Sequence, residues 1–140
     1  MISHVLDTSA VLAHYLNEPG AGDVHSLIAR YDTIGFCVIS LPELKTRLRE
    51  ILGDPGEVER VFALYADTLT TSLSVTREMA DMAIQLRETT RPRLPTVDAV
   101  IAACAQIHQA TLVHRDPHLT AIPTDKLQQL VLPSKNRPGP

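Results

Sequence analysis

The stretch Val5–Leu12, VLDTSAVL, decides which fold the chain is expected to adopt. It overlaps a short, largely apolar run over Ile2–Leu6 that is rich in branched residues, as buried β-strands are. From Ala10 to Leu16 the apolar residues recur at helical spacing. Asp7 therefore lies where a strand passes into a helix. In an open α/β sheet, the carboxyl ends of the strands are the edge that usually binds ligands.

Asp7 also has a structural explanation. Asp, Thr and Ser are favoured helix N-caps, and Thr8 and Ser9 follow it directly. Considered alone, Asp7 is better explained as a cap than as a functional group. A chemical role requires further carboxylates at the same edge of the sheet.

Composition predicts an ordinary globular protein. The chain has 140 residues, 44% hydrophobic and 21% charged, so we expect one domain over residues 1–133 and a disordered, Pro- and Gly-rich tail over 134–140. No stretch approaches the ~18 apolar residues of a membrane span, and no signal peptide is recognisable. Cys37 and Cys104 lie in apolar segments without metal-site spacing, so we expect buried, reduced thiols in a cytoplasmic protein.

The net charge of −3 by itself gives little support to nucleic-acid binding. If four of the sixteen acidic residues surround a cation, however, the other twelve are balanced by thirteen Lys and Arg. Charge therefore does not exclude an RNA substrate.

Apolar spacing and turn residues predict alternating strands and helices. The predicted strands cover Ile2–Leu6, Ile34–Ile39, Leu69–Val75, Leu112–His114 and, more briefly, Leu127–Leu132. The predicted helices cover residues 10–17, 24–31, 41–51, 58–65, 76–88 and 96–108. Because one or two helices separate successive strands, we expect an α/β fold: a three-layer α/β/α sandwich with a mostly parallel sheet of four to five strands.

Some of these elements carry further expectations. Residues 34–39 are almost wholly apolar, so both faces of that strand should be covered, whereas Thr and Ser in residues 69–75 indicate a less buried strand. In the helix over 41–51, Ile51 is expected to face the core. Residues 53–56 should form a turn.

Three more acidic residues stand at junctions between predicted elements. Glu43 lies in the first turn of the helix after the second strand, and Asp116 follows the fourth strand. Both should reach the carboxyl edge near Asp7 if the strands are parallel. Asp98 lies in the first turn of the alanine-rich helix, after a loop, so its position depends on how that loop folds.

Each of these residues has a structural alternative. Ser40 and Glu43 have the spacing of a capping box. Asp98 suits a helix dipole after a Thr96 cap, and Asp116-Pro117 is an ordinary turn pair. The joint placement favours chemistry, because like charges gathered in one cleft repel and require a cation. Mg²⁺ or Mn²⁺ prefers oxygen ligands and could orient and deprotonate a water for attack on a phosphodiester.

Four segments resemble, in order, the motifs of PIN-domain nucleases: DTSA at 7–10, LPEL at 41–44, DAVIAA at 98–103 and LVHRD at 112–116. The last two are much more specific than the first two. The resemblance extends over about residues 2–132, and the length is similar to that of the VapC toxins of bacterial and archaeal toxin–antitoxin pairs.

The resemblance implies a metal-dependent endoribonuclease. The acidic quartet that binds Mg²⁺ or Mn²⁺ and carries out catalysis would be Asp7, Glu43, Asp98 and Asp116. It also implies a homodimer, and a cognate antitoxin whose C-terminal segment occupies the cleft. The implied substrates are structured RNAs, including transfer and ribosomal RNA.

Supporting roles are expected beside the quartet. By resemblance, Ser9 matches a hydroxyl that supports the first Asp, and Thr8 lies beside it. His114 stands where the family commonly has Thr. We favour a hydrogen-bonded histidine at a strand end. The alternative is a ligand or proton carrier that shifts the preference toward Mn²⁺.

Contacts to RNA are expected from Arg115, Arg91 and Arg93, which flank Asp116 and Asp98 in the sequence. Arg115 is the best candidate for a phosphate contact. Lys45 and Arg49 are better explained by a solvated helix face or local pairing. Since aromatic residues make up only 4% of the chain, RNA shape and phosphate positions should dominate recognition.

Two other functions remain open. A PIN-like dimerisation or antitoxin-binding module could have lost activity, although the presence of all four acidic residues argues against this. A phosphotransfer domain could use Asp7 as its nucleophile. Against that function, Asp7-Thr8-Ser9 lacks a second Asp two positions on.

Overall fold

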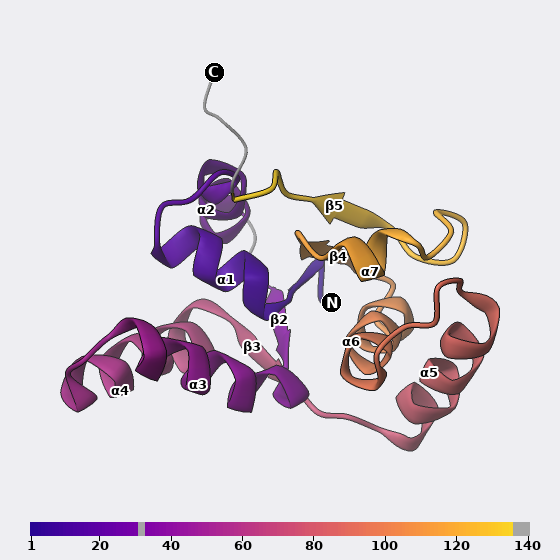
Figure 1. The fold of residues 1–140 in the computed structure, drawn as a ribbon, viewed down its shortest axis with the longest axis horizontal. Coiled ribbons are helices and arrows are strands. Elements are labelled where there is room, and N and C mark those ends of the chain that lie inside the picture. The colour runs from indigo at the N-terminus through magenta and orange to yellow at the C-terminus, as the bar shows by residue number, and fades with distance from the viewer. Residues whose placement is uncertain (31–32, 136–140) are drawn as a thin grey trace.

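A five-stranded, all-parallel sheet forms the centre of the molecule (Figure 1). The computed structural model describes residues 1–30 and 33–135. The strands have the order β3-β2-β1-β4-β5, and their bounds are β1 His4–Leu6, β2 Ile34–Cys37, β3 Thr71–Leu73, β4 Thr111–His114 and β5 Gln129–Val131. The predicted parallel sheet is confirmed, fifth strand included.

Helices cover both faces of this sheet. They are α1 Thr8–Tyr15, α2 Ala21–Arg30, α3 Leu41–Ile51, α4 Pro55–Ala63, α5 Arg77–Thr89, α6 Thr96–Ile107 and α7 Pro117–Thr120, with a 3₁₀ turn η1 Val38–Ser40 and a π-helical segment η2 Leu64–Leu69. Val5 and Leu112 pack in one core with α5 and α6, whereas Leu6 and Val113 pack in a second core with α1, α3 and α4. The fold is therefore the predicted three-layer α/β/α sandwich.

The burial of the strands agrees with their composition. All four residues of β2 are buried, whereas Leu73 is the only buried residue of β3. Gly35 in β2 is required by close packing, because a Cβ there would lie 2.5 Å from Leu73 Cδ1 of the adjacent strand. Cys37 and Cys104 are buried free thiols, as expected.

Several predicted boundaries are wrong. The second strand ends at Cys37 because Val38–Ser40 forms a 3₁₀ turn. Residues 55–56 belong to α4, because Asp54 caps that helix by accepting from the Glu57 N–H at 3.0 Å. Leu69 lies in η2 rather than in a strand, and Ile51 is exposed at the last turn of α3.

Two predictions reach beyond the described residues. Tyr31, the last position of the second predicted helix stripe, lies outside them, as do residues 136–140 of the predicted tail. None of the helices over 1–30 and 33–135 combines the length and apolar character needed to span a lipid bilayer.

Candidate active site

A cavity of about 430 Å³ lies at the carboxyl edge of the sheet. It brings together all four predicted carboxylates, those of Asp7, Glu43, Asp98 and Asp116. The other lining residues are Thr8, Ser9, Leu12, Arg47, Ile101, Arg115, Pro117 and Lys135. Residues far apart in the sequence thus meet because β1, β2 and β4 run parallel and end at one edge.

Asp7 is both a helix cap and a cavity residue. Its Oδ1 accepts from the Ala10 N–H at 3.0 Å, and so caps α1. Only 7% of the residue is exposed. Burial raises the pKa of Asp7 to about 7, and repulsion from Asp116 and Glu43 adds to this against hydrogen bonds from Ser9 and Ala10. The structural and chemical interpretations of Asp7 are therefore compatible.

Ser9 connects the ends of two strands. Its hydroxyl donates to Asp7 Oδ1 at 2.6 Å and accepts from the Arg115 backbone N–H at 3.1 Å. The hydroxyl thus supports the Asp7 carboxylate in the geometry that the sequence resemblance implies. Thr8 is also buried, and its Oγ1 has no hydrogen-bond partner among the described residues although Thr8 lines the cavity.

Asp98 reaches the cavity from the first turn of α6. Burial raises the pKa of Asp98 to about 6, and the neighbouring Asp116 carboxylate adds to this effect. The predicted Thr96 cap is wrong. Pro95 stands at the position before the helix and Thr96 is already helical, and among the described residues no side chain caps this end.

Glu43 lies in the first turn of α3 and is exposed. The predicted capping box with Ser40 does not form, because η1 leads directly into α3 and gives Ser40 a helical backbone conformation. In the described part of the chain, the buried Ser40 hydroxyl has no hydrogen-bond partner. The structural alternative for Glu43 is therefore removed, and its side chain lines the cavity.

Asp116 forms a compact cluster with Asp98 and a histidine that sequence analysis missed. Asp116 Oδ1 accepts from the His118 backbone N–H at 2.9 Å and lies 3.1 Å from His118 Nδ1. The same nitrogen lies 4.0 Å from Asp98 Oδ2. Ligand atoms of the three residues all lie within 4.8 Å of one another. The sequence signal for His118 was the Asp116-Pro117 turn, because such a turn brings the backbone N–H of the following residue to the Asp carboxylate.

His114 has the hydrogen-bonded role that we favoured. It is fully buried, and its Nδ1 accepts from the Asp116 backbone N–H at 2.9 Å. Its Nε2 then carries the proton and donates to Gln129 Oε1 at 2.6 Å. Burial lowers the pKa of His114, which favours this neutral form. With both nitrogens occupied, His114 fixes the Asp116 backbone and is not free to ligate a metal.

The three predicted RNA-contacting arginines have different surroundings. Arg115 lines the cavity; its Nη2 donates to Glu18 Oε1 at 2.6 Å, while within 1–30 and 33–135 its buried Nη1 has no partner. Arg91 instead donates to backbone carbonyls at the end of α5, and Arg93 lines a hollow between α5 and α6. Neither is among the described residues that line the carboxylate cavity.

The structure also gives the positions of three further basic side chains relative to the cavity. Lys45 forms an ion pair with Glu59 at 2.6 Å, the local pairing that we favoured for it. Arg47 and Lys135 line the cavity although neither was selected from the sequence. Arg47 stands four residues after Glu43, so helical spacing places both on one face of α3 and was an available signal, whereas no motif surrounds Lys135.

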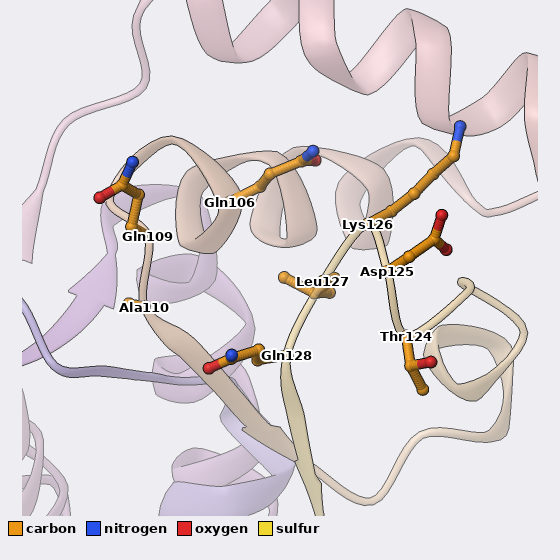
Figure 2. Close-up of a pocket in the computed structure, with 8 residues that line it drawn as sticks. All are labelled: Gln106, Gln109, Ala110, Thr124, Asp125, Lys126, Leu127 and Gln128. Atoms are coloured by element: carbon orange, nitrogen blue, oxygen red, sulfur yellow. The ribbon is translucent and has the colours of Figure 1, made fainter.

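A second cavity, with a smaller volume of about 290 Å³, lies between the end of α6 and the segment before β5. Figure 2 shows the residues that line it. Glutamine side chains contribute much of its polar lining. Within the described ranges, none of the predicted site residues lines it. The acidic cavity is therefore the candidate active site.

The fold and the cavity together define a class: a parallel α/β/α protein with four carboxylates at the carboxyl edge of its sheet. The PIN domain family model matches residues 4–124, and the chain belongs to this family. A comparison with curated protein sequences gives no match.

Solved structures share this fold. VapBC2 from Rickettsia felis, bound to a promoter DNA fragment, superposes with a TM-score of 0.74 at 20% identity, over 95% of this chain and 100% of that one. VapC20 of Mycobacterium tuberculosis, a sarcin–ricin loop cleaving toxin, gives 0.66 at 20% identity, over 85% and 94%. A toxin–antitoxin complex from Klebsiella pneumoniae gives 0.67 at 20% identity, over 86% and 93%.

Proposed function

We propose that the chain is a divalent metal-dependent endoribonuclease and acts as the toxin of a toxin–antitoxin pair. The observation that carries this proposal is the convergence of four carboxylates in one cavity, one of them buried. The raised pKa values of Asp7 and Asp98 support it, because burial first, and repulsion from neighbouring carboxylates second, disfavour the charged forms that a bound cation would stabilise.

The donor set fits Mg²⁺ or Mn²⁺. Asp7, Asp98 and Asp116 would hold the cation, with Glu43 at the more exposed side of the cavity. The Thr8 hydroxyl, which has no hydrogen-bond partner among residues 1–30 and 33–135, adds a further oxygen suited to a hydrated cation or a phosphate. When bound, the cation would supply the positive charge that orients and acidifies water for attack on a phosphodiester.

The chain itself contributes positioning and charge. Ser9 holds the Asp7 carboxylate, and His114 holds the Asp116 backbone. Arg115 offers a phosphate its Nη1, which no group in the described part of the chain engages, while Glu18 restrains Nη2 of the same guanidinium. Arg47 adds a further positive charge at the cavity. Arg91 and Arg93 stay proposals as more distant RNA contacts.

The partners are proposed from the fold and its relatives. A structured RNA of the transfer or ribosomal class is the proposed substrate. A cognate antitoxin is the proposed inhibitor, since toxin–antitoxin complexes share this fold. We also propose that the chain forms a homodimer.

Incubation of the purified chain with total RNA, with and without Mg²⁺ or Mn²⁺, tests the function. We expect metal-dependent fragments that disappear in Asp98→Asn and persist in Asp125→Asn, a matched change of an exposed carboxylate outside the cavity. Sequencing of the fragment ends would then identify the RNA. Intact RNA under all conditions would favour the inactive module, and a stable aspartyl-phosphate would favour phosphotransfer.

A further inference from the structure

We propose that His118 is a direct nitrogen ligand of the cation in the carboxylate cavity, and that it shifts the preference of the site from Mg²⁺ toward Mn²⁺. The inference rests on the proposed metal-dependent function and adds a ligand that the four acidic residues do not supply. It concerns a side chain of α7, the short helix that begins directly after Asp116.

The distances around His118 match those of a coordination shell. An octahedral shell with metal–ligand bonds of about 2.1 Å places adjacent ligand atoms roughly 3 Å apart and opposite ones roughly 4 Å apart. His118 Nδ1 lies 3.1 Å from Asp116 Oδ1 and 4.0 Å from Asp98 Oδ2. These two separations are compatible with an adjacent and an opposite pair, and ligand atoms of His118, Asp116 and Asp98 all lie within 4.8 Å of one another, which places the imidazole beside any cation that the two carboxylates hold.

The local backbone keeps the imidazole at this position. Asp116 caps α7 and accepts from the His118 backbone N–H, so the carboxylate and the ring belong to one tight turn. The His118 side chain is 56% exposed and contributes little to the core. Its place beside two carboxylates therefore comes from its polar contact with Asp116 Oδ1 rather than from packing, and a cation held there would replace that contact.

The neighbouring histidine does not compete for this role. Both ring nitrogens of His114 are hydrogen-bonded, to the Asp116 backbone and to Gln129. The Mn²⁺ preference that the sequence analysis considered for His114 therefore moves to His118.

A nitrogen ligand changes which cation the cavity selects. Mg²⁺ binds oxygen almost exclusively and keeps much of its water, whereas Mn²⁺ and the later transition metals also accept imidazole. We expect His118→Ala to weaken Mn²⁺ binding by at least about tenfold, the effect typical of disturbing a metal site, and to change Mg²⁺ binding much less.

Pulsed electron paramagnetic resonance of Mn²⁺ bound to the purified full chain tests the ligand directly. We expect nitrogen modulation in the wild-type spectrum and its loss in His118→Ala. His25→Ala is the matched control, because this exposed histidine of α2 is not among the described residues lining the cavity, and the modulation should persist there. Calorimetric titrations with Mn²⁺ and Mg²⁺ give the change in selectivity.

The outcomes separate this inference from the proposed function. If Mn²⁺ binds to the wild-type chain and the Asp98→Asn variant loses that binding, but the wild-type spectrum shows no nitrogen modulation, only the role of His118 is overturned. Modulation that persists in His118→Ala does the same. If the wild-type chain binds neither cation and leaves RNA intact, both the proposed function and the inference about His118 are wrong.

Discussion

Replacement of Asp7 by Asn should stabilise the metal-free chain at neutral pH and remove its stabilisation by divalent cations. The Asn carbonyl oxygen can still accept from the Ala10 N–H and the Ser9 hydroxyl, so the helix cap survives. Only the charge is lost. Its loss is favourable without metal because Asp7 is buried beside other carboxylates.

The size of the effect follows from the pKa. Asp7 has a pKa of about 7 in the folded chain against 3.8 for an aspartate side chain that is free in water. Since a tenfold change in an equilibrium is worth about 1.4 kcal/mol, ionising Asp7 costs the folded state about 4 kcal/mol. The folded pKa is the higher one, so the cost is absent below about pH 4, grows as pH rises toward 7 and is complete above it.

The assay is thermal or urea unfolding of both proteins in EDTA from pH 4 to pH 8. The two should be equally stable at pH 4, and the variant should melt on the order of 10 °C higher at pH 8. Saturating Mg²⁺ should stabilise the wild type by about 2.7 kcal/mol at a hundred times its Kd, and the variant far less. A variant that is less stable at pH 8 in EDTA, or a difference that does not change with pH, would refute the reasoning.

Three further predictions concern other parts of the structure. Arg115→Ala should weaken RNA binding and lower the slope of log affinity against log salt by about 1, measured by filter binding at several salt concentrations; an unchanged slope excludes a phosphate contact. His114→Thr should keep Mg²⁺-dependent cleavage, because the imidazole bonds to the Asp116 N–H rather than to metal, but lose about 2 kcal/mol in urea unfolding. Total loss of cleavage in a folded variant would contradict this. Gly35→Ala should cost about 1–3 kcal/mol in the same assay, since its Cβ would clash with Leu73; unchanged stability would show that the adjacent strand yields freely.

The architecture was predictable because it rests on repeated, local signals. The apolar run of β2 and the helical spacing after Asp7 each indicate an element that depends on many residues at once. Parallel pairing then follows from the helices between strands, and it carries Asp7 and Asp116 to one edge. Asp98 was harder to place because its position depends on the path of the loop before α6.

Features that depend on single contacts were not predictable. His118 lies in a four-residue helix, too short to show any periodicity. Ser40 has the residue type and spacing of a cap, yet the preceding 3₁₀ turn denies it the extended backbone that a cap needs. Arg91 lies in the loop after α5 and bonds back to the end of that helix, an outcome that spacing from Asp98 along the chain does not reveal.

Gln129 of β5 connects an edge strand of the sheet to the carboxylate cavity, although Gln129 is not among the described residues that line it. Its amide oxygen accepts a hydrogen bond from His114 Nε2–H, and its amide nitrogen donates to the Ile122 carbonyl at 3.2 Å. Gln129 thus orients the His114 ring, which in turn holds the Asp116 backbone N–H. A glutamine on an edge strand, outside the residues that line the carboxylate cavity, is therefore tied to the position of a proposed metal ligand.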